Sequence, residues 1–222
     1  MLRVAIDGPG GTGKSTIAKA IGAKFKLEYI DTGAMYRSMA LKAVRTGISP
    51  ADESAVAEML KDTSIDFRDG HMYLDGEDVG SLIRTNEISM AASDISKLPC
   101  VRAKADELSK YLAATRNVVM EGRDITTVVI PDAEVKIFMT AAPEIRAQRR
   151  YNQLLEAGKS ADYDQILEEI QKRDYQDSHR TLNPLRQAED AEFLDTSYLT
   201  PEEVVQAIST IITAKTGVVA AG

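Results

Sequence analysis

The chain has 222 residues, of which 44% are hydrophobic and 27% charged, a composition typical of a globular protein with a substantial core. Its net charge of −7 argues against nucleic-acid binding, which normally requires an excess of lysine and arginine. A single cysteine, Cys100, excludes an intramolecular disulfide. The first residues, MLRVAIDG, run directly into a strand pattern, and no apolar run approaches the ~18 residues of a membrane helix. We therefore expect no signal peptide, no membrane partner and a cytoplasmic location.

Short strand patterns alternate with helix patterns along most of the chain. The expected strands are Leu2–Asp7, a short segment ending at Ile30, and segments 117–121, 135–140 and 191–196. The expected helices are 14–24, a helix from the Asp31-Thr32 cap to about Arg45 that Gly47 closes, 51–61, 85–97, 99–115, 143–156, 163–177 and 201–213. This alternation predicts an α/β fold in which helices cover both faces of a parallel sheet.

Three local patterns complete this prediction. Residues 62–84 interrupt the alternation with alternating apolar residues and the pairs Asp69-Gly70 and Asp75-Gly76, which favour an inserted antiparallel hairpin. Thr200 and Glu203 have the spacing of a capping box at the start of the last helix. No partner is predicted for the C-terminal residues 215–222, so we expect this tail to fray.

A glycine-rich segment predicts a phosphate site. Gly8-Pro9-Gly10-Gly11-Thr12-Gly13-Lys14-Ser15 matches the pattern G-x-x-x-x-G-K-[ST], follows a strand and opens a helix, with Thr16 next in that helix. The glycines let backbone N–H groups cradle phosphate oxygens, and the helix N-terminus adds partial positive charge. We expect Lys14 to reach the β- and γ-phosphates and Ser15 to ligate Mg²⁺. The segment therefore predicts binding of a nucleoside triphosphate.

The rest of the chain narrows the class of nucleotide-binding protein. A GTPase would carry an Asp-x-x-Gly switch and an Asn-Lys-x-Asp guanine reader downstream of the glycine loop, and neither occurs there. A large ATPase motor would need a longer chain. A small kinase is favoured, in which arginines hold a second anionic substrate. The candidates cluster within 146–186 and are Arg146, Arg149, Arg150, Arg173, Arg180 and Arg186.

Five segments carry a resemblance to a known family. They are IDGPGGTGKST, YIDTGAMYR, IRTNEISMAAS, EGRDITTVVIPDAEVKIFMTA and RDYQDSHR…NPL…EDAEFLDTS. Over about residues 3–213 the chain resembles the bacterial cytidylate kinases, which are P-loop nucleoside monophosphate kinases. The resemblance implies one domain spanning 1–222, with a P-loop NTPase-type five-stranded parallel sheet flanked by helices. It also implies a monophosphate-binding part at about 31–115, including a small antiparallel sheet at 62–84, and a mobile helical lid at about 146–165.

The resemblance also implies roles for individual residues. A clamp on the monophosphate would consist of Arg37, Arg123 and Arg180, which with Lys14 would form the catalytic set. Cytosine would be read by Ser93, Arg102 and Asp124, with Thr32 beside them. The ribose would contact Arg173 and Asp177, and ATP would contact the lid arginines Arg149 and Arg150. Glu121 stands where the family more often has aspartate, which suggests an outer-sphere contact to the Mg²⁺ shell.

The chemistry of cytosine agrees with these positions. A carboxylate such as Asp124 accepts from the amino group at N4, and an arginine such as Arg102 donates to N3 and O2, whereas uracil presents an oxygen at position 4. The implied activity is transfer of the γ-phosphoryl group of MgATP to CMP or dCMP by a monomer. Two alternatives stay open: a P-loop kinase for another acceptor such as UMP or AMP, and a nucleotide-sensing module that signals through the lid.

Overall fold

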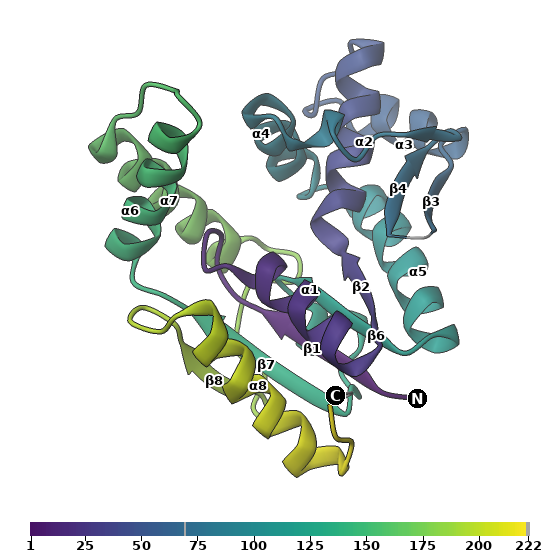
Figure 1. Cartoon of the computed structure of the whole chain (residues 1–222). Coiled ribbons are helices and arrows are strands. Elements are labelled where there is room, and N and C mark those ends of the chain that lie inside the picture. The colour runs from purple at the N-terminus through teal and green to yellow at the C-terminus, as the bar shows by residue number, and fades with distance from the viewer. Residues whose placement is uncertain (69, 221–222) are drawn as a thin grey trace. The chain divides into compact units, whose positions relative to one another are not determined.

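The computed structural model describes residues 1–68 and 70–220 (Figure 1). The chain divides into two compact units. We call the first, Met1–Tyr29 with the chain from Asn117 onward, the core unit, and the second, Ile30–Arg116, the middle unit. Each unit is described by itself. Among the described residues no helix has the length and apolar character needed to cross a membrane.

A five-stranded sheet with the strand order β2-β6-β1-β7-β8 confirms the predicted parallel sheet. Its strands are β1 (Arg3–Asp7), β2 (Glu28–Asp31), β6 (Val118–Gly122), β7 (Val135–Thr140) and β8 (Glu192–Asp195). β1 pairs in parallel with β6 and β7, and Asp7 lies beside both Gly122 and Phe138. Because these strands run in one direction, the loops that follow β1 and β6 leave the sheet at the same edge, where parallel sheets bind ligands.

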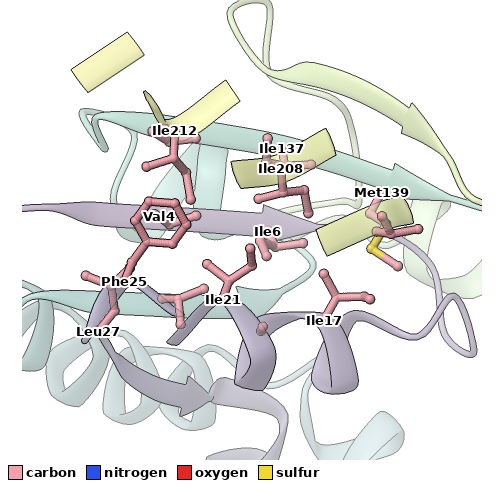
Figure 2. Packing of buried hydrophobic residues seen from close by; sticks show 14 residues of the cluster. Val4, Ile6, Ile17, Ile21, Phe25, Leu27, Ile137, Met139, Ile208 and Ile212 are labelled. Carbon is pink, nitrogen blue, oxygen red and sulfur yellow. The ribbon is translucent and has the colours of Figure 1, made fainter. Parts of the chain in front are cut away.

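The core of this unit is formed between the sheet and two helices, α1 (Lys14–Phe25) and α8 (Pro201–Thr216). Figure 2 shows Ile21 of α1 and Ile208 and Ile212 of α8 directed at the strands, and all three are fully buried. Each such side chain contributes about 1.5–3 kcal/mol through burial. The buried face of α1 holds its first residue, Lys14, at the end of the glycine loop.

Two further helices and one unexpected element complete the core unit. α6 (Pro143–Glu156) and α7 (Tyr163–His179) lie against each other (Figure 1), with Gly158 at a φ of 70° in the turn between them. A π-helix, η2 (Ile125–Val129), follows β6 and was not predicted. Helix α8 runs to Thr216 rather than 213, and the predicted capping box of Thr200 and Glu203 is present.

The C-terminal tail differs from its prediction in part. Gly217, at a φ of 72°, ends α8, and Ala220 packs against the hydrophobic core. The tail therefore has partners as far as Ala220, and these include an ion pair of Lys215 with Glu192 at 2.9 Å. Sequence reasoning did not foresee them because Glu192 and the core residues are distant in the chain or come from other elements. Residues 221 and 222 lie outside the described residues.

The middle unit contains four helices and a small sheet among its described residues. The helices are α2 (Thr32–Thr46), α3 (Glu53–Lys61), α4 (Asn86–Ile95) and α5 (Pro99–Thr115), with a 3-10 helix η1 (Leu82–Arg84). Asp31 caps α2 by accepting from the N–H of Ala34 at 3.0 Å, and Gly47 ends the helix at a φ of 69°. Both helix ends agree with the prediction of an N-cap at Asp31 and a helix end at Gly47.

The inserted segment forms a three-stranded antiparallel sheet rather than a hairpin alone. Its strands are β3 (Ile65–Arg68), β4 (His71–Leu74) and β5 (Glu77–Asp78). Asp75 and Gly76 have φ values of 50° and 87°, the left-handed pair that a two-residue hairpin turn requires. The pair Asp75-Gly76 therefore adds a third strand. Asp69 of the other predicted turn lies outside the described residues.

We expect Gly8→Ala to destabilise the core unit severely. Gly8 has a φ of 151°, and a Cβ on it would lie 1.9 Å from the carbonyl oxygen of Met139, a backbone atom that cannot move aside. The loss in free energy of unfolding should exceed about 3 kcal/mol, measured by urea denaturation. Gly217→Ala is the control, because Gly217 has a φ of 72° but open space around its Cβ position. It should cost only about 1 kcal/mol.

Candidate nucleotide-binding site

The glycine loop joins β1 to α1 in a conformation that depends on its glycines. Gly8, Gly11 and Gly13 have φ values of 151°, 78° and 92°. Gly13 is the N-cap of α1, and it has no side chain that could occupy the first N–H groups of the helix. Those groups and the partial positive charge of the helix end are therefore available to an anion.

Lys14 is buried inside this loop rather than extended into water. It is 4% exposed, and its Nζ donates to the carbonyl of Pro9 at 2.7 Å. Burial, together with repulsion by Arg123, lowers the pKa of Lys14 to about 7, and attraction by Glu121 and Asp7 opposes part of this shift. A bound triphosphate would bring negative charge and restore the ammonium form. Ser15 and Thr16 follow in the exposed first turn of α1.

We expect Lys14→Met to abolish phosphoryl transfer and yet to stabilise the unliganded protein at neutral pH. The pKa of Lys14 is about 7 in the folded state and near the ordinary lysine value of 10.5 in the unfolded state. At a pH between these two pKa values the unfolded chain binds more protons than the folded protein, so the free energy of unfolding rises with pH across that window. Removal of the amine should flatten this rise and add about 1–3 kcal/mol at pH 7, measured by urea unfolding at pH 7 and pH 9.

The matched control is Lys110→Met, which removes an exposed lysine on α5. It should leave both activity and the pH dependence of stability as they are in the unsubstituted protein. Full activity in the Lys14→Met variant would overturn the assignment of the glycine loop, and an unchanged pH slope would assign the slope to another group.

Asp7 connects the two loops at the edge of the sheet. It is fully buried, and its carboxylate accepts from the N–H of Ile125 at 3.0 Å, the N–H of Thr126 at 2.7 Å and the hydroxyl of Thr126 at 2.6 Å. Burial raises the pKa of Asp7, and the hydrogen bonds from Thr126 oppose that shift. Asp7 precedes the glycine loop, and Ile125 follows Arg123 and Asp124. The carboxylate of Asp7 therefore holds the start of η2 against the end of β1.

The predicted acceptor residues of the core unit form two ion pairs. Nε of Arg123 donates to Asp177 at 2.8 Å, and Nη2 of Arg180 lies 3.6 Å from Oδ1 of Asp124. Burial opposes the charge on Asp177, but the attraction of Arg123 holds the pKa of that carboxyl below its usual range. A Cβ on Gly10 would lie 3.4 Å from Nη2 of Arg123 and 3.9 Å from Nε of Arg173. These arginines therefore lie directly against the glycine loop.

Glu121 has a partner that sequence reasoning missed. It is 6% exposed, and the hydroxyl of Tyr29 donates to its Oε1 at 2.6 Å. Nζ of Lys19 lies 5.5 Å from the centre of the Tyr29 ring. No pattern in the sequence pairs residue 29 with residue 121, because the contact depends on the pairing of β2 with β6.

In the middle unit, Arg37 is held at the start of α2. Its Nη2 donates to Asp31 at 2.7 Å, so one carboxylate both caps the helix and orients the arginine. A Cβ on Gly33 would lie 3.0 Å from Nη1 of Arg37 and 3.1 Å from Oδ1 of Asp31. Gly33 therefore leaves room for the guanidinium. Thr32, beside this pair, is buried in the first turn of α2.

Arg102 is buried on α5 in the same unit. Its Nη1 donates to the carbonyl of Ser96 at 3.0 Å, and its guanidinium lies 5.6 Å from the centre of the Tyr36 ring. Ser93 on α4 accepts a hydrogen bond from Ser96 through its carbonyl at 2.9 Å. The segment Ser93–Ser96 and Arg102 are thus connected within the middle unit.

The two predicted lid arginines differ in their contacts. Nη2 of Arg149 donates to the carbonyls of Thr196 at 2.7 Å and Ser197 at 3.4 Å, in the loop after β8. The hydroxyl of Thr196 in turn lies 3.5 Å from the carbonyl of Thr12 in the glycine loop. Arg150 is exposed on α6. Arg149 is therefore connected to the glycine loop through two hydrogen bonds, and Arg150 faces solvent.

The predicted acceptor residues divide between the two units. Those of the core unit are Arg123, Asp124, Arg173, Asp177 and Arg180, and those of the middle unit are Thr32, Arg37, Ser93 and Arg102. Within the core unit the structure places Arg123 and Arg173 beside the glycine loop. It pairs Arg123 with Asp177 and places Arg180 near Asp124. Within the middle unit it places Arg37 beside Asp31, and Arg102 beside Tyr36.

Comparison with known proteins assigns the family. The family model described as cytidylate kinase matches residues 4–214. The chain belongs to the cytidylate kinase family. A cytidylate kinase of Mycobacterium leprae is 45% identical over 97% of this chain and 97% of its own length. A cytidylate kinase of Caldicellulosiruptor bescii is 47% identical over 93% of each chain.

A solved structure adds a weaker likeness. The shikimate kinase of Bacteroides thetaiotaomicron superposes with a TM-score of 0.48 and 13% identity, over 95% of this chain and 98% of that one. A likeness at this level does not bear on the activity. Membership in the cytidylate kinase family rests on the near-complete match of sequence.

Proposed function

We propose that the protein transfers the γ-phosphoryl group of MgATP to CMP or dCMP, giving CDP or dCDP and ADP. The proposal is supported by family membership and, above all, by one observation. The glycine loop, with its buried lysine, lies directly against Arg123 and Arg173, two of the residues expected to hold the acceptor. We further propose that it acts as a monomer in the cytoplasm.

The donor would occupy the glycine loop. Gly8, Gly11 and Gly13 adopt the left-handed φ values that turn backbone N–H groups to one side, and Lys14 would exchange its bond with Pro9 for a phosphate oxygen. Ser15, exposed at the start of α1, offers a hydroxyl oxygen of the hard type that Mg²⁺ prefers. Bound Mg²⁺ would neutralise charge on the phosphates.

The acceptor would be held by arginines already paired with carboxylates. Arg123 and Arg180 would exchange part of their contact with Asp177 and Asp124 for the monophosphate, and Arg37 would do so from the middle unit. Planar guanidinium groups bind phosphate through two parallel N–H bonds. Asp124 and Arg102, with Ser93 and Thr32, would read the base. Arg173 and Asp177 would contact the ribose.

The chemistry needs positioning more than proton transfer. A phosphate oxygen of CMP is already anionic, so it can attack the γ-phosphorus in line without a catalytic base. Lys14 and the arginines would stabilise the oxygens on which charge develops. The helices α6 and α7, which contain the predicted lid at 146–165, would exclude water that otherwise hydrolyses ATP. Arg149 and Arg150 are the lid residues proposed to contact ATP.

The test is an assay of ADP release with MgATP against CMP, dCMP, UMP, AMP and GMP. Turnover on CMP and dCMP, with at least about a hundredfold preference in kcat/KM over the other monophosphates, is the expected result. A preference for UMP or AMP would assign another acceptor. Triphosphate binding without turnover on any of them would favour the nucleotide-sensing alternative.

We expect Asp124→Ala to impair use of CMP much more than use of ATP. The carboxylate is proposed to accept from the N4 amino group of cytosine, and its loss leaves Arg180 without the charge that lies 3.6 Å away. The KM for CMP should rise by about tenfold or more, while the KM for ATP should change by less than about twofold. Initial rates with each substrate varied in turn provide the measurement.

The control is Asp132→Ala, which removes an aspartate whose side chain is 73% exposed and which pairs with Arg3. Neither KM should change in that variant. An unchanged KM for CMP in Asp124→Ala would remove Asp124 from the base pocket.

A further inference from the structure

A buried arginine of the 146–186 cluster, to which no individual role was assigned, contacts the glycine loop. Arg146, in the first turn of α6, is 3% exposed. Its guanidinium donates to the carbonyl of Gly10 at 2.9 Å and to the carbonyl of Ala141 at 2.8 Å. Both of its terminal nitrogens bond the carboxylate of Asp174 on α7, at 3.1 Å and 2.5 Å. Arg146 therefore joins the glycine loop and α7 through one rigid, planar group.

The bond to Gly10 sets the direction of one peptide group in the loop. In a planar trans peptide the carbonyl of Gly10 and the N–H of Gly11 point in opposite directions. With the carbonyl directed at Arg146, the N–H of Gly11 points away from the guanidinium. Backbone N–H groups of a glycine loop are the ligands of phosphate oxygens. The orientation of this peptide therefore affects how well the loop binds a triphosphate.

Asp174 is the carboxylate that pairs with the buried guanidinium of Arg146. The carboxylate bonds both terminal nitrogens of the guanidinium, and one of these nitrogens also bonds Gly10. Asp174 lies on α7 next to Arg173 and one turn before Asp177. Arg173 itself approaches the loop, because a Cβ on Gly10 would lie 3.9 Å from its Nε. A continuous path of hydrogen bonds therefore leads from α7 through Arg146 to the Gly10 carbonyl.

We propose that Asp174, acting through Arg146, is a positioning residue that orients the Gly10–Gly11 peptide for the triphosphate and links the glycine loop to α7. The first part requires only that the loop binds a triphosphate. The second part rests on the proposed function, in which α7 contacts the ribose of the acceptor. Because such linkage is reciprocal, CMP and the triphosphate should each tighten the binding of the other by the same factor.

The test is titration calorimetry of Asp174→Asn with the magnesium complex of β,γ-imido-ATP, with and without CMP. The triphosphate Kd should rise by about five- to tenfold, and the factor by which CMP changes that Kd should fall towards one. The direction of the change in the triphosphate Kd distinguishes positioning from simple electrostatics. Loss of a negative charge near an anion site would by itself tighten binding, so weaker binding separates positioning from simple electrostatics.

Three further variants complete the design. Glu168→Gln removes the same charge from an exposed position on α7 and should leave both Kd values unchanged. Asp174→Glu keeps the carboxylate and should restore most of the lost affinity. Arg146→Lys keeps the positive charge but loses the planar fork, so it should weaken triphosphate binding as Asp174→Asn does. If Asp174→Asn does not fold, the same titrations are made with Arg146→Lys instead.

The outcomes are distinguishable from those that bear on the proposed function. Unchanged or tighter triphosphate binding in folded Asp174→Asn and Arg146→Lys would overturn the positioning role. Equal triphosphate affinity with and without CMP in the unsubstituted protein would overturn the link to α7. A protein that binds the triphosphate but phosphorylates no monophosphate would overturn the proposed activity, and the titrations without CMP would still decide the role of Asp174.

Discussion

The hydrogen bonds of Asp7 are the interaction on which the geometry of the candidate site depends. A carboxylate fully removed from water is costly unless it is bonded, and here Ile125 and Thr126 supply two N–H groups and a hydroxyl. The bonds join the end of β1, from which the glycine loop starts, to the end of the loop that carries Arg123 and Asp124. One buried group thereby sets the spacing between the start of the glycine loop and the segment that carries Arg123 and Asp124.

Charges in the site are paired before any ligand arrives. Arg123 lies against Asp177, Arg37 against Asp31 and Arg146 against Asp174. Each of these pairs lies within one unit, so each is held in place by the contacts of its own unit. Such pairing limits the cost of burying several arginines near a buried lysine, and it fixes side chains that would otherwise lose rotamer freedom on binding. Lys14 differs from these arginines because its amine donates to the carbonyl of Pro9 and not to a carboxylate. Burial beside Arg123 therefore lowers the pKa of Lys14.

Much of the fold was predictable because its elements are locally specified. Helices α5 and α6 and strand β7 have the predicted bounds, and the caps at Asp31 and Thr200 are those the sequence indicated. At both caps the signal that starts the helix comes from a residue within one turn of the helix end. The π-helix η2 was missed, because it is stabilised by Asp7, more than a hundred positions away in the chain. The third strand of the small sheet was missed because β5 is only two residues long.

By itself the sequence determined the glycine-loop motif, most of the order of strands and helices, and the family, since these depend on residue types at short spacing. The identities of the proposed site residues, such as Arg123 and Asp177, came from motif positions. Only the tertiary structure decided which of them meet: Arg123 with Asp177, Tyr29 with Glu121, and Arg146 with both Gly10 and Asp174. These partners come from different strands and helices, and their contacts exist only because the sheet and the α6–α7 pair bring distant segments within hydrogen-bonding distance.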